Sequence, residues 1–196
     1  MLLGLQVTGV TPDPHPTPDV DETMLWLTDR APDVRTAVLV LGRYPHEQRE
    51  HRLPLRRVDL RRTNFYYGTL IKVDLGDSNL AGSAAAGVHW EKCRFWNTDL
   101  RKTQFKGAIL NQSEFIGAHL HGANLPGASL READLTDASL RRANLRNADL
   151  RGAKLRRTDL RGADLSGARL LGAQLADVRA DHDTKWPAGF TATQQA

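Results

Sequence analysis

The large apolar residues of the chain recur every five positions over most of its length. From residue 60 to residue 175, each position divisible by five holds Leu or Phe, except Ala85 and Trp90, which makes 24 successive units. A period of five fits neither the 3.6-residue repeat of a helix nor the two-residue alternation of a strand. The pattern instead predicts a coil that turns a corner in every unit and stacks its successive turns as layers.

A small or at most β-branched residue stands two positions before each of these central residues, as at Thr98, Ala123 and Ala143. We expect it to be small because its copies stand above one another at the strand spacing of roughly 4.8 Å. Gly, Asn and Asp recur at other positions and suit tight turns, because they accept unusual backbone angles and bond to the nearby chain. Each unit is therefore expected to supply one small and one large inward side chain.

Many units read Ala, then Asp or Asn, then Leu. Examples are Ala123-Asn124-Leu125-Pro126-Gly127 and Ala163-Asp164-Leu165-Ser166-Gly167. This motif resembles the pentapeptide-repeat family, and the resemblance covers about two thirds of the chain. It implies an all-β solenoid: a right-handed quadrilateral β-helix of pentapeptide repeats with four units per coil and about six coils.

The pattern divides the chain into four segments. We expect an irregular, Pro-rich arm over 1–20, a short helical cap over 21–54, the pentapeptide-repeat β-helix over 55–180, and a capping tail over 181–196. Similar short helical segments precede the repeats in some actinobacterial members of the family. Trp186 and Phe190 in the tail are expected to cover the last coil, because the end of a solenoid is an exposed edge.

The register is weakest where Ala85 and Trp90 replace the usual Leu or Phe. We interpret the small and the oversized residue as volume compensation within one layer, with a bulge or short loop as the alternative. Cys93 occupies a small inward position, so we expect an inert core thiol rather than a nucleophile. A single cysteine excludes an internal disulfide and is typical of a reducing compartment.

The apolar N-terminal stretch over residues 1–7 is too short for a signal peptide or a transmembrane helix. We therefore expect a cytoplasmic protein with no membrane partner. We predict no cofactor and no catalytic residues, because the sequence has no Gly-rich phosphate loop, nucleophile elbow or Cys/His metal spacing. His119 and His121 flank an inward Leu without a third ligand, so no metal is predicted.

Charge is concentrated in the repeats, where residues 55–180 carry 21 basic and 13 acidic side chains. With four units per coil, Arg61, Arg101, His121, Arg141 and Arg161 fall in one outward column, and Arg62, Lys102 and Arg142 in the next. Such a column is a candidate surface for phosphates or for an acidic protein. The alternative, which we favour, is a solvated face interleaved with Asp59, Asp99 and Asp159.

A second candidate surface is apolar. Trp96 and Ile116 share an outward column, with Ile109 on the adjoining face, and Tyr66, Tyr67 and Ile71 cluster near the first coil. Exposed apolar groups gathered in one place often mark an interface. The alternative is that the N-terminal helical segments cover them.

The sequence therefore favours a non-enzymatic protein-interaction scaffold over an enzyme. The best-known activity in the family is protection of DNA gyrase or topoisomerase IV from drugs and toxins, by members that resemble duplex DNA in shape and surface charge. That activity is our second hypothesis, and the basic repeats argue against it because mimicry of DNA requires an acidic surface. A basic rod that binds nucleic acid is the third.

Overall fold

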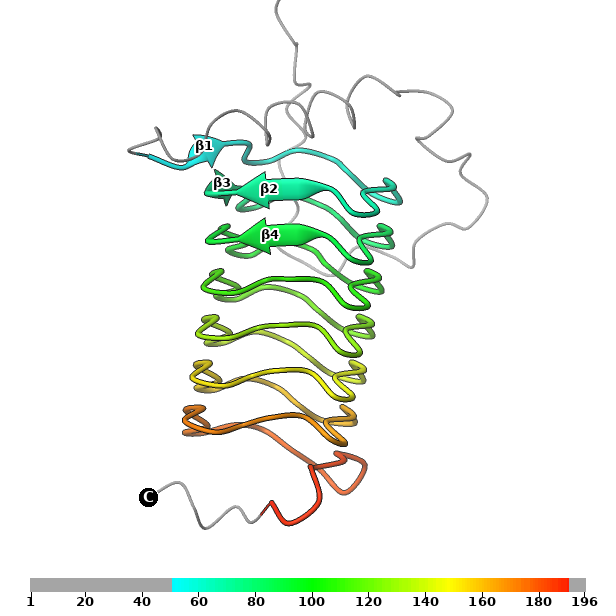
Figure 1. The fold of residues 1–196 in the computed structure, drawn as a ribbon, viewed down its shortest axis with the longest axis vertical. Helices are drawn as coiled ribbons and strands as arrows, with labels where there is room; N and C mark the ends of the chain where they lie inside the picture. The colour runs from blue at the N-terminus through cyan, green and yellow to red at the C-terminus, as the bar shows by residue number, and fades with distance from the viewer. Residues whose placement is uncertain (1–50, 191–196) are drawn as a thin grey trace, which may run out of the picture.

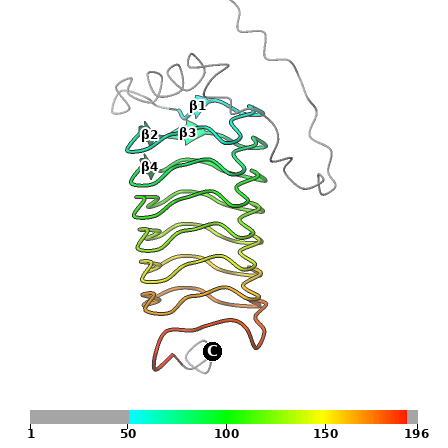
Figure 2. The same cartoon turned by 90° about the vertical axis from the view of Figure 1, so that its right-hand side faces the viewer.

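Parallel backbone pairing at a spacing of 20 residues shapes the part of the chain that the computed structural model describes, residues 51–190. Strand β1 (Leu53–Pro54) pairs with β3 (Val73–Asp74), and β2 (Thr69–Ile71) pairs with β4 (His89–Glu91). Single bridges continue the same spacing, and one column runs through Asp59, Asn79, Asp99, His119, Ser139, Asp159 and Arg179. Twenty residues are four five-residue sides, so the coils stack along a rod with four faces (Figure 1, Figure 2).

A β-turn forms the corner at the end of most sides. In the turn after Leu60, the Thr63 N–H donates to the Leu60 carbonyl at 3.2 Å. Every fifth residue from Arg57 to Asp177 has a positive φ, as the third residue of a type II turn requires. Glycine fills ten of these positions, and fifteen hold another residue. The expected turns are confirmed, but they do not require Gly.

The Asn and Asp residues just before the central positions support these turns with their side chains. Asp134 Oδ1 accepts from the Thr136 N–H at 3.1 Å, and Asn79 Oδ1 accepts from the Ala81 N–H at 3.0 Å. These local bonds satisfy backbone donors at the corner that the ladder leaves over. The expected local role of Asn and Asp is confirmed.

The core is the stack of central and small side chains, as the sequence predicts. The central residues from Leu60 to Leu165 are buried, and Ser and Thr at the small positions direct their hydroxyls to the backbone. Ser83 Oγ donates to the Leu60 carbonyl at 2.8 Å, and Thr158 Oγ1 donates to the Leu135 carbonyl at 2.8 Å. A buried hydroxyl is tolerated because this bond to the preceding coil replaces water.

Trp90 fills the space that Ala85 leaves, without a break in the ladder. Its ring lies 5.2 Å from that of Phe65 and 5.9 Å from that of Phe105, the central residues directly before and after Ala85 in its column. Ala84 keeps its bridges to Asn64 and Gln104. The volume compensation is therefore confirmed, and the bulge or loop is excluded.

The two ends differ from the predicted boundaries in detail. The ladder begins at β1, so Leu53–Pro54 belong to the first coil and not to the helical cap expected over 21–54. The arm over 1–20 and the rest of that cap lie outside the described residues. At the other end the spacing changes once, because Asp164 bridges to Lys185 rather than to residue 184. One inserted residue precedes this bridge.

The tail then resumes the inward pattern. Thr184 Oγ1 donates to the Leu160 carbonyl at 3.1 Å, as the small residues of the coils do, and Trp186 follows at the central position. Trp186 and Phe190 stack with ring centroids 4.7 Å apart and pack, partly buried, against the core. They cover the last coil as expected.

We predict that Leu125→Ala, which removes a buried central side chain, lowers the free energy of unfolding by about 2–5 kcal/mol. Urea denaturation followed by circular dichroism measures this change. Lys106→Ala, at an exposed position on the preceding coil, is the control and should change it by less than about 0.5 kcal/mol. Equal effects of the two variants would contradict the assigned core.

Candidate interaction surfaces

Backbone hydrogen bonds bring the predicted basic column together along one corner of the rod. The Gly82 N–H donates to the Arg101 carbonyl at 2.8 Å, the Lys102 N–H to that of His121 at 3.0 Å, and the Arg142 N–H to that of Arg161 at 2.9 Å. Arg61, Arg101, His121, Arg141 and Arg161 therefore lie on one edge in the predicted order. Their role in binding stays a prediction.

Three of these arginines are engaged with carboxylates. Arg61, Arg101 and Arg161 each bind the Asp two residues earlier in a two-pronged contact, with Nη2 to Oδ2 distances of 2.7, 2.7 and 2.6 Å. The bond from Arg161 holds the pKa of Asp159 below its usual value. Arg141 follows Ser139 and has no such carboxylate, so the expected interleaving with acids applies to only part of the column.

His121 lies among cations at this corner. Burial, and then the cations Arg141, Arg142, Arg101 and Lys102, lower the pKa of His121. Its imidazole is therefore neutral at pH 7, since the ordinary histidine pKa is about 6.5. Residues 51–190 contain no group of three His, Cys, Asp or Glu side chains placed to hold a metal ion.

The neighbouring column alternates cations with glycine from coil to coil: Arg62, Gly82, Lys102, Gly122, Arg142 and Gly162. Each cation has a positive φ, and its stem lies against the glycine of the next coil. A Cβ added to Gly162 would lie 3.2 Å from Cγ of Arg142, and one added to Gly82 would lie 3.5 Å from Cγ of Arg62. The missing Cβ therefore makes room for the Arg142 stem at Gly162, whereas at Gly82 an added Cβ would make an ordinary contact.

One face of the rod carries the whole net charge of the repeats. We call five successive coils of it the cationic face: residues 61–67, 81–87, 101–107, 121–127 and 141–147. These segments contain eight Lys or Arg and no Asp or Glu, whereas the remainder of residues 55–180 carries thirteen of each sign. On the next coil, 161–167, Asp164 balances Arg161. Lys106 and Arg146, on the corner opposite the predicted column, belong to this face and were missed. Counting charges in rows of 20 residues finds them.

The predicted apolar pair is less exposed than expected. Trp96 and Ile116 lie on adjacent coils, as the Asn97 N–H bond to the Ile116 carbonyl at 3.1 Å shows, but both are half-buried. The Arg94 guanidinium covers Trp96, 3.9 Å from the ring centroid. Within residues 51–190, the large apolar side chains that are exposed are Tyr66, Tyr67, Ile109 and Leu171.

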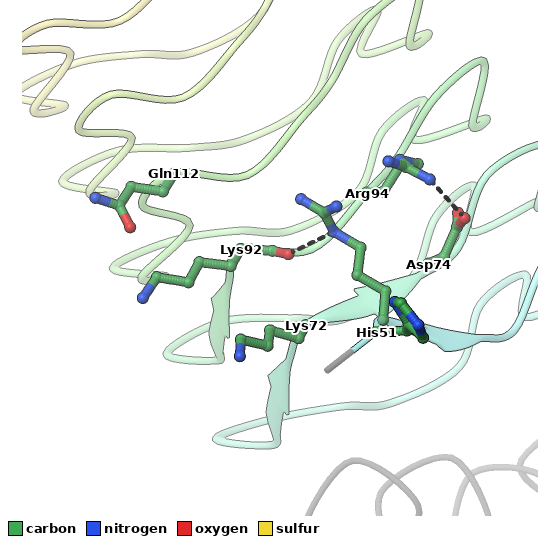
Figure 3. Close-up of a pocket in the computed structure, with 7 residues that line it drawn as sticks. His51, Lys72, Asp74, Lys92, Arg94 and Gln112 are labelled. Atoms are coloured by element: carbon green, nitrogen blue, oxygen red, sulfur yellow. Dashed lines mark hydrogen bonds and ion pairs between the residues drawn. The ribbon is translucent and has the colours of Figure 1, made fainter. Parts of the chain in front are cut away.

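A cleft of about 610 Å³ near the N-terminal end of the rod escaped the sequence analysis (Figure 3). Its arginines belong to an ion-pair network: Arg94 binds Asp74 and Glu114, each at 3.2 Å, while Arg52 pairs with Glu114 and donates to the Lys92 carbonyl at 3.1 Å. These contacts join residues far apart in sequence, so the network fastens the first coils together. Spacing alone does not reveal it, because the Arg52 side chain reaches across two coils.

Cys93 is a core thiol, as predicted. It is fully buried, its Sγ lies 3.2 Å from the Leu70 carbonyl, and burial raises its pKa to about 12. The thiol form therefore persists in the folded protein at pH values where an exposed cysteine ionises.

A rod of parallel coils with four five-residue sides defines a β-helix solenoid. A family model described as pentapeptide repeats matches residues 78–115, 113–152 and 143–179, and the chain belongs to this family. Its coil is right-handed, as parallel crossover connections almost always are. No helix within residues 51–190 is long and apolar enough to cross a membrane.

Several solved structures resemble this chain. A pentapeptide repeat protein of the Arabidopsis thaliana thylakoid lumen is 34% identical over 54% of this chain and 70% of its own, with a TM-score of 0.41. Rfr23 from the cyanobacterium Cyanothece 51142 is 28% identical over 68% and 88%, with a TM-score of 0.35. QnrB1, a plasmid-mediated fluoroquinolone resistance protein, is 19% identical over 65% and 70%, with a TM-score of 0.37. Comparison with curated proteins finds no match.

We predict that iodoacetamide at pH 8.5 leaves Cys93 of the folded protein unmodified and labels it fully in guanidinium chloride, as mass spectrometry would record. A Cys93→Ala, Lys106→Cys variant is the control, because its thiol stands at an exposed corner and should react in the folded state. Rapid labelling of native Cys93 would show that the coil opens around it.

Proposed function

We propose that the chain is a non-enzymatic scaffold that binds an acidic surface of another protein through its cationic face. The observation that carries this proposal is the separation of charge: eight cations and no acid on five successive coils of one face, against thirteen of each sign on the rest of the repeats. A rigid face with one sign of charge attracts and orients a partner of the opposite sign. The expected cytoplasmic location is part of the same proposal.

The architecture supports a scaffold rather than an enzyme. The inward residues are buried in the core, which leaves only the outward side chains to form a site. Catalysis usually needs a concave pocket. In the cleft of Figure 3, Arg94 is paired with Asp74, and Arg52 donates to the Lys92 carbonyl. Pentapeptide repeat proteins are generally scaffolds without enzymatic activity.

Protection of a topoisomerase is the second candidate, because QnrB1, a plasmid-mediated fluoroquinolone resistance protein, is among the structures that resemble this chain. Mimicry of DNA would require an acidic face on the rod. Outside the cationic face, thirteen basic and thirteen acidic residues balance, so the rest of the repeats has no net acidic charge. The charge distribution therefore disfavours this function.

The scaffold proposal predicts that the full chain retains host proteins in a pull-down and that Arg62→Glu, Lys102→Glu, Arg142→Glu together abolish this retention. The reversal replaces attraction by repulsion along the cationic face. A matched control, Arg131→Glu, Arg156→Glu, Arg169→Glu, changes the net charge equally outside this face and should retain the proteins. Loss with both triple variants, or with neither, would contradict binding through the cationic face.

For DNA gyrase, we predict that the full chain gives no protection from a quinolone in a supercoiling assay, even at a large molar excess. A gyrase-protecting pentapeptide repeat protein serves as the positive control. Protection at a low molar ratio would overturn the scaffold proposal in favour of the second candidate.

A further inference from the structure

The cationic face is corrugated along the rod. Large exposed side chains occupy alternate coils, in segments 61–67, 101–107 and 141–147, whereas no residue of 81–87 is exposed and only Gly127 of 121–127 is. Since neighbouring coils are roughly 4.8 Å apart, ridges and troughs repeat about every 9.6 Å. Ala84 and Asn124 are the outward residues in the middle of the two troughs.

Cations mark the ridges on both edges of this face. One edge carries Arg62, Lys102 and Arg142, and the other carries Lys106 and Arg146, each separated from the next by two coils. Acids next to the face pair with some of its cations: Arg61 with Asp59 and Arg101 with Asp99, each at 2.7 Å, and Arg146 with Asp164 at 3.7 Å. A ligand on this face therefore meets positive charge at intervals of about 9.6 Å on either side.

Two tyrosines replace the cation on the first ridge of the second edge. Tyr66 is 49% exposed and Tyr67 is 82% exposed. Tyr67 has a φ of 55°, and among the residues with positive φ from Arg57 to Asp177 it alone is aromatic, all others being glycine or polar. Its ring lies over Gly87, where an added Cβ would approach within 2.6 Å of the ring.

This placement costs stability in two ways, because a bulky residue is strained at positive φ and a large apolar ring faces water. The turn does not require an aromatic ring here, since the other positive-φ positions from Arg57 to Asp177 hold glycine or polar residues. Tyrosine is also among the residues that contribute most to binding energy at protein interfaces. The pair Tyr66–Tyr67 is therefore an anchor point for a ligand on the cationic face.

We propose that the partner element bound by the cationic face is an acidic amphipathic α-helix lying along the rod, a statement that rests on the proposed scaffold function. Residues seven apart on a helix are separated by about 10.5 Å, close to the spacing of the ridges. Carboxylates at this interval meet Arg62, Lys102 and Arg142, while the helix side chains between them enter the troughs. An apolar residue of the helix packs on Tyr66 and Tyr67.

The spacing separates this ligand from other polyanions. Side chains on one side of an extended strand repeat about every 6.7 Å and fall out of step with the ridges after one interval. Phosphates of a DNA strand in a duplex are spaced about 3.4 Å along the axis, so they neither require nor exploit a corrugation of this period. A helix is the element whose repeat follows both the charges and the troughs.

The test uses the full chain and a fluorescent helical peptide of about three heptads, with Glu at every seventh residue and a Leu anchor near one end. Anisotropy should show binding, and a scrambled peptide of equal composition should bind at least about tenfold more weakly. Tyr67→Asn should lower the affinity for the helical peptide about tenfold. The affinity for a peptide without the Leu anchor should not change. Because Asn accepts a positive φ, the thermal unfolding midpoint of the Tyr67→Asn variant should equal or exceed that of the parent chain.

Equal affinity for the helical and scrambled peptides, an unchanged affinity in Tyr67→Asn, or tighter binding of a 20-nucleotide oligothymidylate would each overturn the helix assignment. A lower thermal midpoint of Tyr67→Asn would assign the ring a structural role instead. These failures are distinct from failure of the scaffold function. If the peptides fail while Arg62→Glu, Lys102→Glu, Arg142→Glu still abolishes retention of host proteins, only the helix assignment falls.

Discussion

The backbone hydrogen bond between neighbouring coils is the constraint on which the rest of the structure depends. Central residues up to Leu165 donate their N–H to the next coil, as Leu125 does to the Asn144 carbonyl at 2.7 Å. Because this bond fixes the separation of coils near 4.8 Å, side chains of one column stand in contact with their own copies. The inward columns therefore accept side chains of only a few sizes. In the outward columns, residues 20 apart in sequence lie next to one another, and their size is not restricted in this way.

The fold was predictable from the sequence because the constraint acts on every unit and leaves a period of five. The four-sided coil came from the family resemblance, and the bridges confirm it. Trp90 beside Ala85 was predictable as a volume exchange, since both lie on one coil. The inserted residue before Thr184 was not, because one residue added to a corner changes neither the inward pattern nor the composition.

The surface was harder to predict than the core. The basic column was found, but whether an arginine is compensated depends on the residue two places before it, as Asp159 and Ser139 illustrate for Arg161 and Arg141. Stems that lie on a glycine of the next coil depend on the sign of φ, which the sequence does not display. The separation of charge onto one face appears only when both corners are read together, and it separates this rod from the acidic surface that a DNA mimic needs.

The alternation of cations with glycine along one corner has a consequence for how such a rod changes length in evolution. A duplication of 20 residues adds one coil and keeps every face, yet it would place two like coils together and interrupt the alternation of Arg62, Gly82 and Lys102. A duplication of 40 residues preserves both the faces and the alternation of cations with glycine. Descendants that keep the alternation should therefore lengthen in steps of 40 residues, and those that have lost it are free to lengthen in steps of 20.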